Sequence, residues 1–67
     1  MKKRQKAIYE YIGEYIENNS YPPTIREIAE GVGLSSPATV HGHLSRLKNK
    51  GFVDFEPTRP RTLRLIK

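Results

Sequence analysis

The sequence predicts a mainly α-helical fold, in which three helices are followed by a small two-stranded β-hairpin. Three observations support this prediction: an amphipathic stripe near the N-terminus, two helix-start signals separated by a glycine-containing turn, and a C-terminal stretch of alternating apolar and polar residues. The chain has 67 residues, which is enough for one domain, and we expect residues 1–67 to form a single unit.

The first helix is predicted from apolar residues that recur at intervals of three and four. These residues are Ile8, Tyr11, Ile12, Tyr15 and Ile16. Such spacing places them along one face of a helix that should cover about residues 4–18. The stretch NNSYPP should end this helix, because proline lacks an amide donor and restricts the residue before it.

The second helix is predicted from a capping box. Thr24 and Glu27 form the pattern T-x-x-E, in which the hydroxyl and the carboxylate each accept a hydrogen bond from an amide at the helix start. We expect this helix to end at about Glu30, since Gly31 and Gly33 follow within three residues. The segment GVGL is then the expected turn.

The third helix lies between a start signal and a stop signal. Ser36 followed by Pro37 is typical of a helix start, and Gly51 is typical of a helix end, so the helix should span about residues 37–50. Beyond it, FVDF and RTLRLI alternate apolar and polar residues on either side of EPTRP, which predicts a hairpin with a tip of five or six residues. The hairpin would be the wing of a winged helix-turn-helix.

The third predicted helix has two unlike faces. Successive residues lie 100° apart, so Val40, Leu44 and Leu47 form a buried stripe with His43 beside them. The opposite face carries small residues, and larger ones flank them. The small residues are Ala38, Gly42 and Ser45, and the flanking ones are Thr39, His41 and Arg46. A glycine inside a helix costs about 1 kcal/mol relative to alanine. We interpret it as clearance that lets the helix backbone approach another surface.

The charge pattern indicates that this other surface is negative. The net charge is +5, and no carboxylate lies between residues 31 and 53, whereas Arg46, Lys48 and Lys50 do. Arg59 and Arg61 follow in the hairpin. The major groove of B-DNA admits an α-helix, and short Thr and Ser side chains or Arg reach its base edges. The prediction is sequence-specific binding of double-stranded DNA, with phosphate contacts from Lys48, Lys50, Arg59 and Arg61.

A protein-interaction module is the alternative. Small side chains such as Ala38 and Gly42 would also allow close packing against a helix of a dimer or of another partner. A short capped helix, a turn and a second helix form the helix-turn-helix arrangement, in which the second helix contacts DNA bases, and this favours DNA. Winged helices nevertheless serve both uses.

The segment YPPTIREIAEGVGLSSPATVHGHLSRLKNKGFV, with RQKAIYEYI before it and PTRPRTLRLI after it, resembles the N-terminal DNA-binding domain of the LexA repressors, especially their Gram-positive type. The resemblance covers nearly the whole chain. It implies a winged helix-turn-helix that binds a palindromic operator as a homodimer and represses genes of the SOS response to DNA damage. Operators of that type resemble GAAC and GTTC half-sites.

The resemblance also implies which residues contact DNA. By position, the base-contacting residues of the family fall on Ser36, Ala38, Thr39, His41 and Gly42. Its wing, which approaches the neighbouring backbone, falls on Arg59 and Arg61. LexA proteins continue into a peptidase domain with a Ser–Lys dyad that cleaves the chain itself when activated RecA filaments are present. This sequence has no counterpart of that domain, so RecA would be a partner only of a protein that carries it.

Other functions receive little support from the residues. His41 and His43 lie about 200° apart on a helix, so they cannot chelate one metal ion together, and the chain has no cysteine. A Ser–His–acid triad lacks its acid between Ser35 and Lys50. We therefore expect no enzyme activity, metal or cofactor. No apolar run approaches the ~18 residues of a membrane span, and we expect a cytoplasmic, nucleoid-associated protein without membrane contact.

Overall fold

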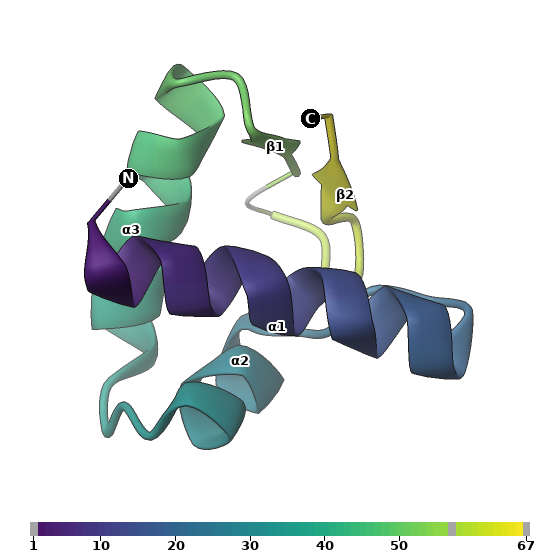
Figure 1. Cartoon of the computed structure of the whole chain (residues 1–67), viewed down its shortest axis with the longest axis horizontal. Coiled ribbons are helices and arrows are strands. Elements are labelled where there is room, and N and C mark those ends of the chain that lie inside the picture. Colours follow the sequence, from purple (N-terminus) through teal and green to yellow (C-terminus); the bar gives the residue numbers. More distant parts are fainter. Residues whose placement is uncertain (1, 57, 67) are drawn as a thin grey trace.

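The computed structural model describes residues 2–56 and 58–66 and contains three helices and a two-stranded sheet within them. The order along the chain is α1 (Lys3–Asn19), α2 (Ile25–Val32), α3 (Pro37–Asn49), β1 (Val53–Asp54) and β2 (Arg64–Leu65). Figure 1 shows α1 crossing in front of α3, with α2 below α1 and the two hairpin strands above it, beside α3. The predicted mainly helical fold with a short hairpin is confirmed, and it has the form of a winged helix-turn-helix.

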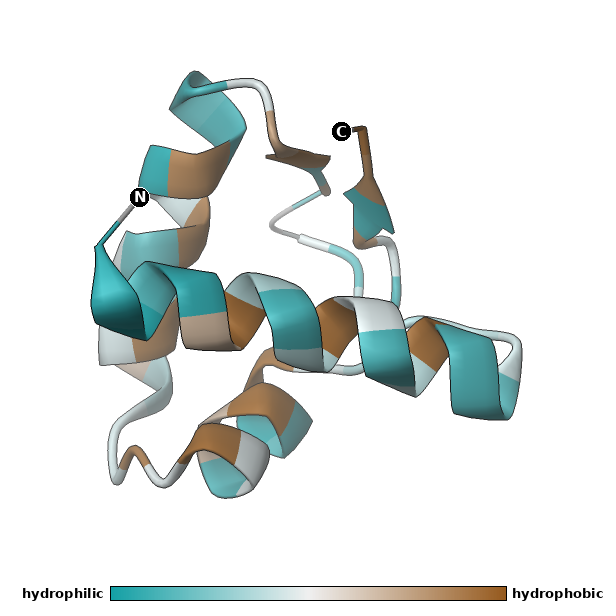
Figure 2. Ribbon diagram, in the orientation of Figure 1, coloured by the Kyte–Doolittle hydropathy of each residue, from teal (hydrophilic) through white to brown (hydrophobic). Residues whose placement is uncertain are grey.

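The core lies where the three helices and the hairpin meet. Its buried apolar residues are Ile8, Ile12, Ile28, Ala29, Val40, Leu44, Leu47, Val53, Phe55 and Leu63. Every helix contributes to this set, and the apolar positions recur turn by turn between polar ones along α1 (Figure 2). The predicted apolar stripe of α1 is therefore the surface on which α2 and α3 pack. No helix among the described residues combines the length and apolarity needed to cross a membrane.

The capping box at the start of α2 is present as predicted, but the predicted end of this helix was wrong. The Glu27 amide donates to Thr24 Oγ1 at 3.2 Å, and the Thr24 amide donates to Glu27 Oε1 at 2.8 Å. The helix continues through Gly31 to Val32 and ends at Gly33, whose φ of 76° is left-handed. A glycine suits position 31 because α1 passes close by: a Cβ atom there would overlap the ring of Tyr11.

The ends of α3 agree with the prediction to within one residue. Ser36 precedes the helix and its carbonyl accepts from the Thr39 amide at 3.2 Å, although its hydroxyl makes no capping hydrogen bond. At the other end Gly51 adopts a φ of 80°, and the Phe52 amide donates to the Leu47 carbonyl at 3.0 Å. This left-handed glycine turns the chain from α3 into the hairpin.

The hairpin strands are shorter than predicted, with Val53 paired to Leu65 and Asp54 to Arg64. Its connection covers 55–63 rather than five or six residues, and Pro57 lies outside the described residues. Beyond the last pair, the Thr62 hydroxyl accepts from the Glu56 amide at 2.9 Å and lies 3.2 Å from the Glu56 carbonyl, so a side chain links the two sides of the connection.

Candidate nucleic-acid interface

The outward face of α3 is free of the protein core. Val40 and Leu44 are fully buried on the inner face, while Ala38 and Thr39 are exposed on the outer one. Gly42 lies on the outer face too, and a Cβ atom built on it would meet nothing within 4 Å. The packing of this chain therefore gives no reason for a glycine at position 42.

Further along α3, the outward-facing side chains become longer and basic. Ser45 is half-buried, and Arg46, Lys48 and Lys50 are exposed. The first turn of α3 has no acidic residue and the last turn carries two basic ones. The face thus changes from small side chains at the N-terminal end to cations at the C-terminal end.

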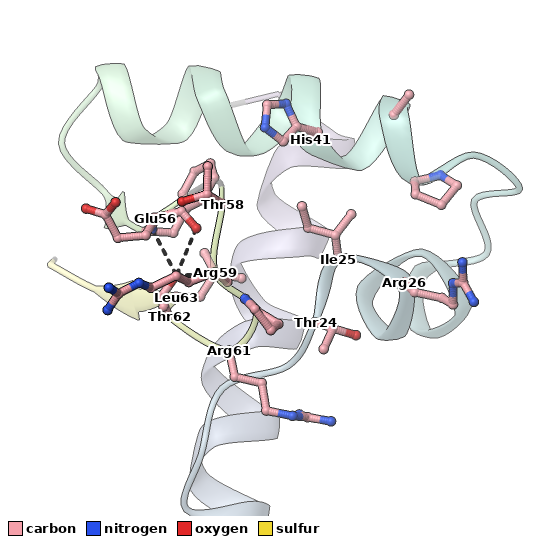
Figure 3. A pocket seen from close by; sticks show the side chains of 14 residues that line it. Thr24, Ile25, Arg26, His41, Glu56, Thr58, Arg59, Arg61, Thr62 and Leu63 are labelled. Atoms are coloured by element: carbon pink, nitrogen blue, oxygen red, sulfur yellow. Dashed lines mark hydrogen bonds between the residues drawn. The ribbon is translucent and has the colours of Figure 1, made fainter.

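A cleft of about 540 Å³ lies between the start of α2, the first half of α3 and the hairpin connection. Ala38 and His41 line it from α3, and Arg26 lines it from α2 (Figure 3). The edge of the His41 ring faces the Phe55 ring, with centroids 5.9 Å apart. Arg59 lines the cleft from the connection and is exposed. The structure therefore brings the small face of α3 and the wing together around one opening.

Sequence reasoning missed Arg26, which lines this cleft beside Ala38. Arg26 is exposed in the first turn of α2, close to the start of α3. The available signal was its position in the first helix of the helix-turn-helix. The charge pattern gave no such signal, because the same helix also carries Glu27 and Glu30.

Two of the predicted phosphate-contacting lysines have partners within the chain. Lys48 Nζ donates to the Phe55 carbonyl at 3.1 Å and lies 3.7 Å from Asp54 Oδ1, which ties the end of α3 to β1. Lys50 Nζ donates to Oε1 of the buried Gln5 at 3.3 Å. Both lysines remain exposed; to reach an external anion, Lys50 would leave its contact with Gln5, and Lys48 its contacts with Phe55 and Asp54.

Arg61, by contrast, is turned away from its expected position on the wing tip. Its guanidinium donates to both carboxylate oxygens of Glu27, at 3.0 and 3.1 Å, and to the Pro22 carbonyl at 3.1 Å. It also lies over the ring of Tyr21, 4.9 Å from the centroid. Arg61 is exposed, and its predicted phosphate contact would require the guanidinium to leave these three hydrogen bonds to α2 and the preceding connector.

Glu27 accepts four hydrogen bonds. Besides Arg61, the Thr24 amide donates to Oε1, and the Tyr15 hydroxyl of α1 donates to Oε2 at 3.1 Å. The Thr24 amide and the Arg61 guanidinium lower the pKa of Glu27 to about 2. The carboxylate is therefore charged throughout the ordinary pH range.

The N-terminal cations lie near α3. Lys2 precedes α1 directly, so this basic segment leads into an ordered helix. Burial lowers the pKa of His43, and the positive charges of Arg46, Arg4 and Lys2 lower it further. Nδ1 of His43 is buried and has no hydrogen-bond partner among the described residues. His43 thus packs on the inner side of α3, as predicted, within the electrostatic influence of the N-terminal cations Lys2 and Arg4 and of Arg46 on its own helix.

Comparison with known proteins assigns the family. The family model described as the LexA DNA binding domain matches residues 1–62. A LexA repressor of Staphylococcus epidermidis is 52% identical over 64 residues, and one of Staphylococcus carnosus is 53% identical over the same length. Each match covers 96% of this chain but 31% of the relative, so the chain spans about a third of the length of these relatives. The chain therefore belongs to the LexA DNA-binding domain family.

Proposed function

We propose that this chain binds a specific double-stranded DNA operator, with α3 in the major groove, and acts as the DNA-binding part of a transcriptional repressor. The observation that supports the proposal most directly is the open space around Gly42 on the outward face of α3. A helix that carries small side chains there can place its backbone close to base edges.

The division of labour follows from the positions of the side chains. Ser36, Ala38, Thr39, His41 and Gly42, at the N-terminal end of α3, would face the bases, with Ser45 behind them. Phosphate contacts would come from Arg46, Lys48 and Lys50 of α3, Arg59 of the wing and, as an addition from the structure, Arg26 of α2. Arg61 was predicted as a further phosphate contact; it would have to leave Glu27 to make one, and we propose a different role for it below.

One copy of the domain offers the contacts of one half-site, so we propose that two copies bind a palindromic operator with half-sites of the GAAC and GTTC kind. A single copy should bind weakly. Self-cleavage stimulated by RecA would require the part of the relatives that this chain does not match, and we assign it to that part.

The test is a fluorescence anisotropy titration of a labelled palindromic duplex and of a scrambled duplex over a series of salt concentrations. Five phosphate contacts per copy predict a slope of about −4.5 for the logarithm of the affinity of each bound copy against the logarithm of salt concentration. The palindrome should bind more tightly than the scrambled duplex at every salt concentration. A slope near zero, or equal binding of both duplexes, would contradict the proposal.

Two substitutions at Gly42 separate DNA binding from protein docking. Gly42→Glu places a carboxylate toward the phosphate-lined groove, whereas Gly42→Gln has a similar volume without the charge. Both should weaken operator binding because they fill the clearance, and the glutamate should weaken it more, especially at low salt. If Gly42→Glu binds the operator as the unchanged chain does, the outward face of α3 serves a protein partner instead.

A further inference from the structure

The further inference concerns four residues linked by hydrogen bonds, which we call the Glu27 clasp. The Glu27 carboxylate accepts from the Arg61 guanidinium and the Tyr15 hydroxyl, and Arg61 also donates to the Pro22 carbonyl. The four residues come from α2, the wing, α1 and the connector between the helices. Glu27 and Arg61 are separated by 34 positions in the sequence, so their contact joins distant parts of the fold.

We propose that Arg61 is a positioning residue for DNA binding, which uses the Glu27 clasp to hold the wing against α2 and thereby sets the opening between the wing and α3. This inference rests on the DNA-binding function proposed above. It differs from the ordinary expectation for an arginine on a wing, in which the guanidinium itself binds a phosphate.

The first argument is geometric. The guanidinium of Arg61 donates from both terminal nitrogens to both oxygens of Glu27, which is the two-point contact that fixes orientation as well as distance. Each oxygen of Glu27 has a further donor, the Thr24 amide on Oε1 and the Tyr15 hydroxyl on Oε2. The carboxylate is therefore held from two other directions before Arg61 binds to it.

The second argument concerns the backbone of the wing. Arg61 has a φ of 57°, a left-handed conformation that side chains other than glycine adopt at a cost. The contacts of its side chain with Glu27, Pro22 and Tyr21 compensate for that cost. Because the strands of the hairpin contain only two residues each, strand pairing alone offers little to keep the long connection in place.

The third argument is the position of the clasp relative to the interface. Arg61 lines the same cleft as Ala38 and His41 of α3, but its guanidinium points away from His41 (Figure 3). Arg59, two residues earlier, is exposed and lines the cleft. A wing anchored through Arg61 thus presents Arg59 at a fixed place beside the face that would enter the groove.

Glu27→Gln tests this proposal, because the two explanations predict opposite signs. Glutamine at this position still accepts the hydrogen bond of the capping box, so the start of α2 is preserved. Removing a negative charge from a DNA-binding domain ordinarily strengthens binding. Loss of the clasp instead lowers the fraction of molecules with the wing in place, and apparent affinity falls by the same factor. We expect operator affinity to fall about three- to tenfold.

The matched control is Glu30→Gln, the same substitution on the same helix. Glu30 is exposed and makes no ion pair within the described part of the chain. Its replacement should leave operator affinity unchanged or raise it slightly. If Glu27→Gln behaves like Glu30→Gln while the unchanged chain binds the operator specifically, the clasp has no positioning role and DNA binding still stands. If the unchanged chain shows no specific binding, the proposed function itself fails.

Arg61→Lys supplies a second variant with a readout that a phosphate contact would not give. Lysine keeps the charge but cannot make the two-point contact with Glu27. We expect Arg61→Lys to reduce operator affinity, to leave the salt slope unchanged and to speed amide hydrogen exchange in the hairpin. The double variant with Glu27→Gln should bind the operator no more weakly than either single variant. If Arg61→Ala reduces the magnitude of the salt slope by about 1, Arg61 contacts a phosphate and the proposal is overturned.

Discussion

Replacing Gly42 with alanine should stabilise this protein and weaken its binding to DNA, two effects of opposite sign from one methyl group. Gly42 lies inside α3 and does not have a positive φ, so alanine can adopt its backbone conformation. A Cβ atom there meets nothing within 4 Å, so the new methyl group contacts no other part of the chain.

The size of the stabilisation follows from helix propensity alone. Alanine is favoured over glycine inside a helix by about 1 kcal/mol, and no clash offsets this gain. For a domain of this size, about 1 kcal/mol corresponds to a rise in melting temperature of roughly 4–8 °C. In complex with DNA, the same methyl group fills the space that the proposal gives to the groove. One extra carbon in a closely fitted contact predicts roughly a tenfold loss of operator affinity.

The assay combines thermal unfolding, followed by circular dichroism, with an operator titration. Gly31→Ala is the matched control, since it is the same substitution inside the neighbouring helix α2. A Cβ atom at position 31 overlaps the half-buried ring of Tyr11, so overpacking should remove the helical gain and lower the melting temperature. Position 31 lies outside the proposed interface.

Two results would refute this reasoning. If Gly42→Ala fails to raise the melting temperature, position 42 is not an open helical site. If it raises the melting temperature and the operator binds as tightly as before, α3 does not approach DNA closely at Gly42, and the clearance interpretation is wrong.

Three further predictions concern the core, the pH dependence and the interface. Leu44 is fully buried, so Leu44→Ala should lower the free energy of unfolding by about 3 kcal/mol in a urea titration, and a loss below about 1 kcal/mol would contradict its place in the core. The pKa of His43 is lowered from 6.5, so the unfolded chain binds the proton more readily; stability should be complete above pH 6.5 and decline as pH falls below it, and His43→Gln should remove this decline. Glu27, with its lowered pKa, adds a separate loss only as pH falls from about 4.5 toward 2, and an unchanged unfolding curve between pH 7 and pH 5 would contradict the role of His43. Arg26→Ala should reduce the salt slope of operator binding by about 1 without altering the melting temperature, and an unchanged slope would remove Arg26 from the interface.

Much of the fold was predictable because its signals are local. The apolar stripe of α1 and the capping box of Thr24 and Glu27 depend on residues within one or two turns of each other. The two faces of α3 follow from the fixed angle between successive residues, which places Leu44 inward and Gly42 outward whatever the rest of the chain does. The small, acid-free character of the outward face of α3 is equally a property of one helix.

Contacts between distant segments decided the rest. Gly31 lies inside α2 with the ring of Tyr11, from another helix, where a side chain would be, and no pattern within GVGL reveals that neighbour. As an arginine on the wing, Arg61 has the charge expected of a phosphate ligand, but both of its terminal nitrogens donate to Glu27, 34 positions earlier. Arg26 lines the cleft because α2 packs beside α3. The sequence by itself thus determined which helices form and which faces they present, since periodicity and capping act over a few residues. Only the tertiary structure decided which charged side chains are available to a partner, because charges are paired across space rather than along the chain.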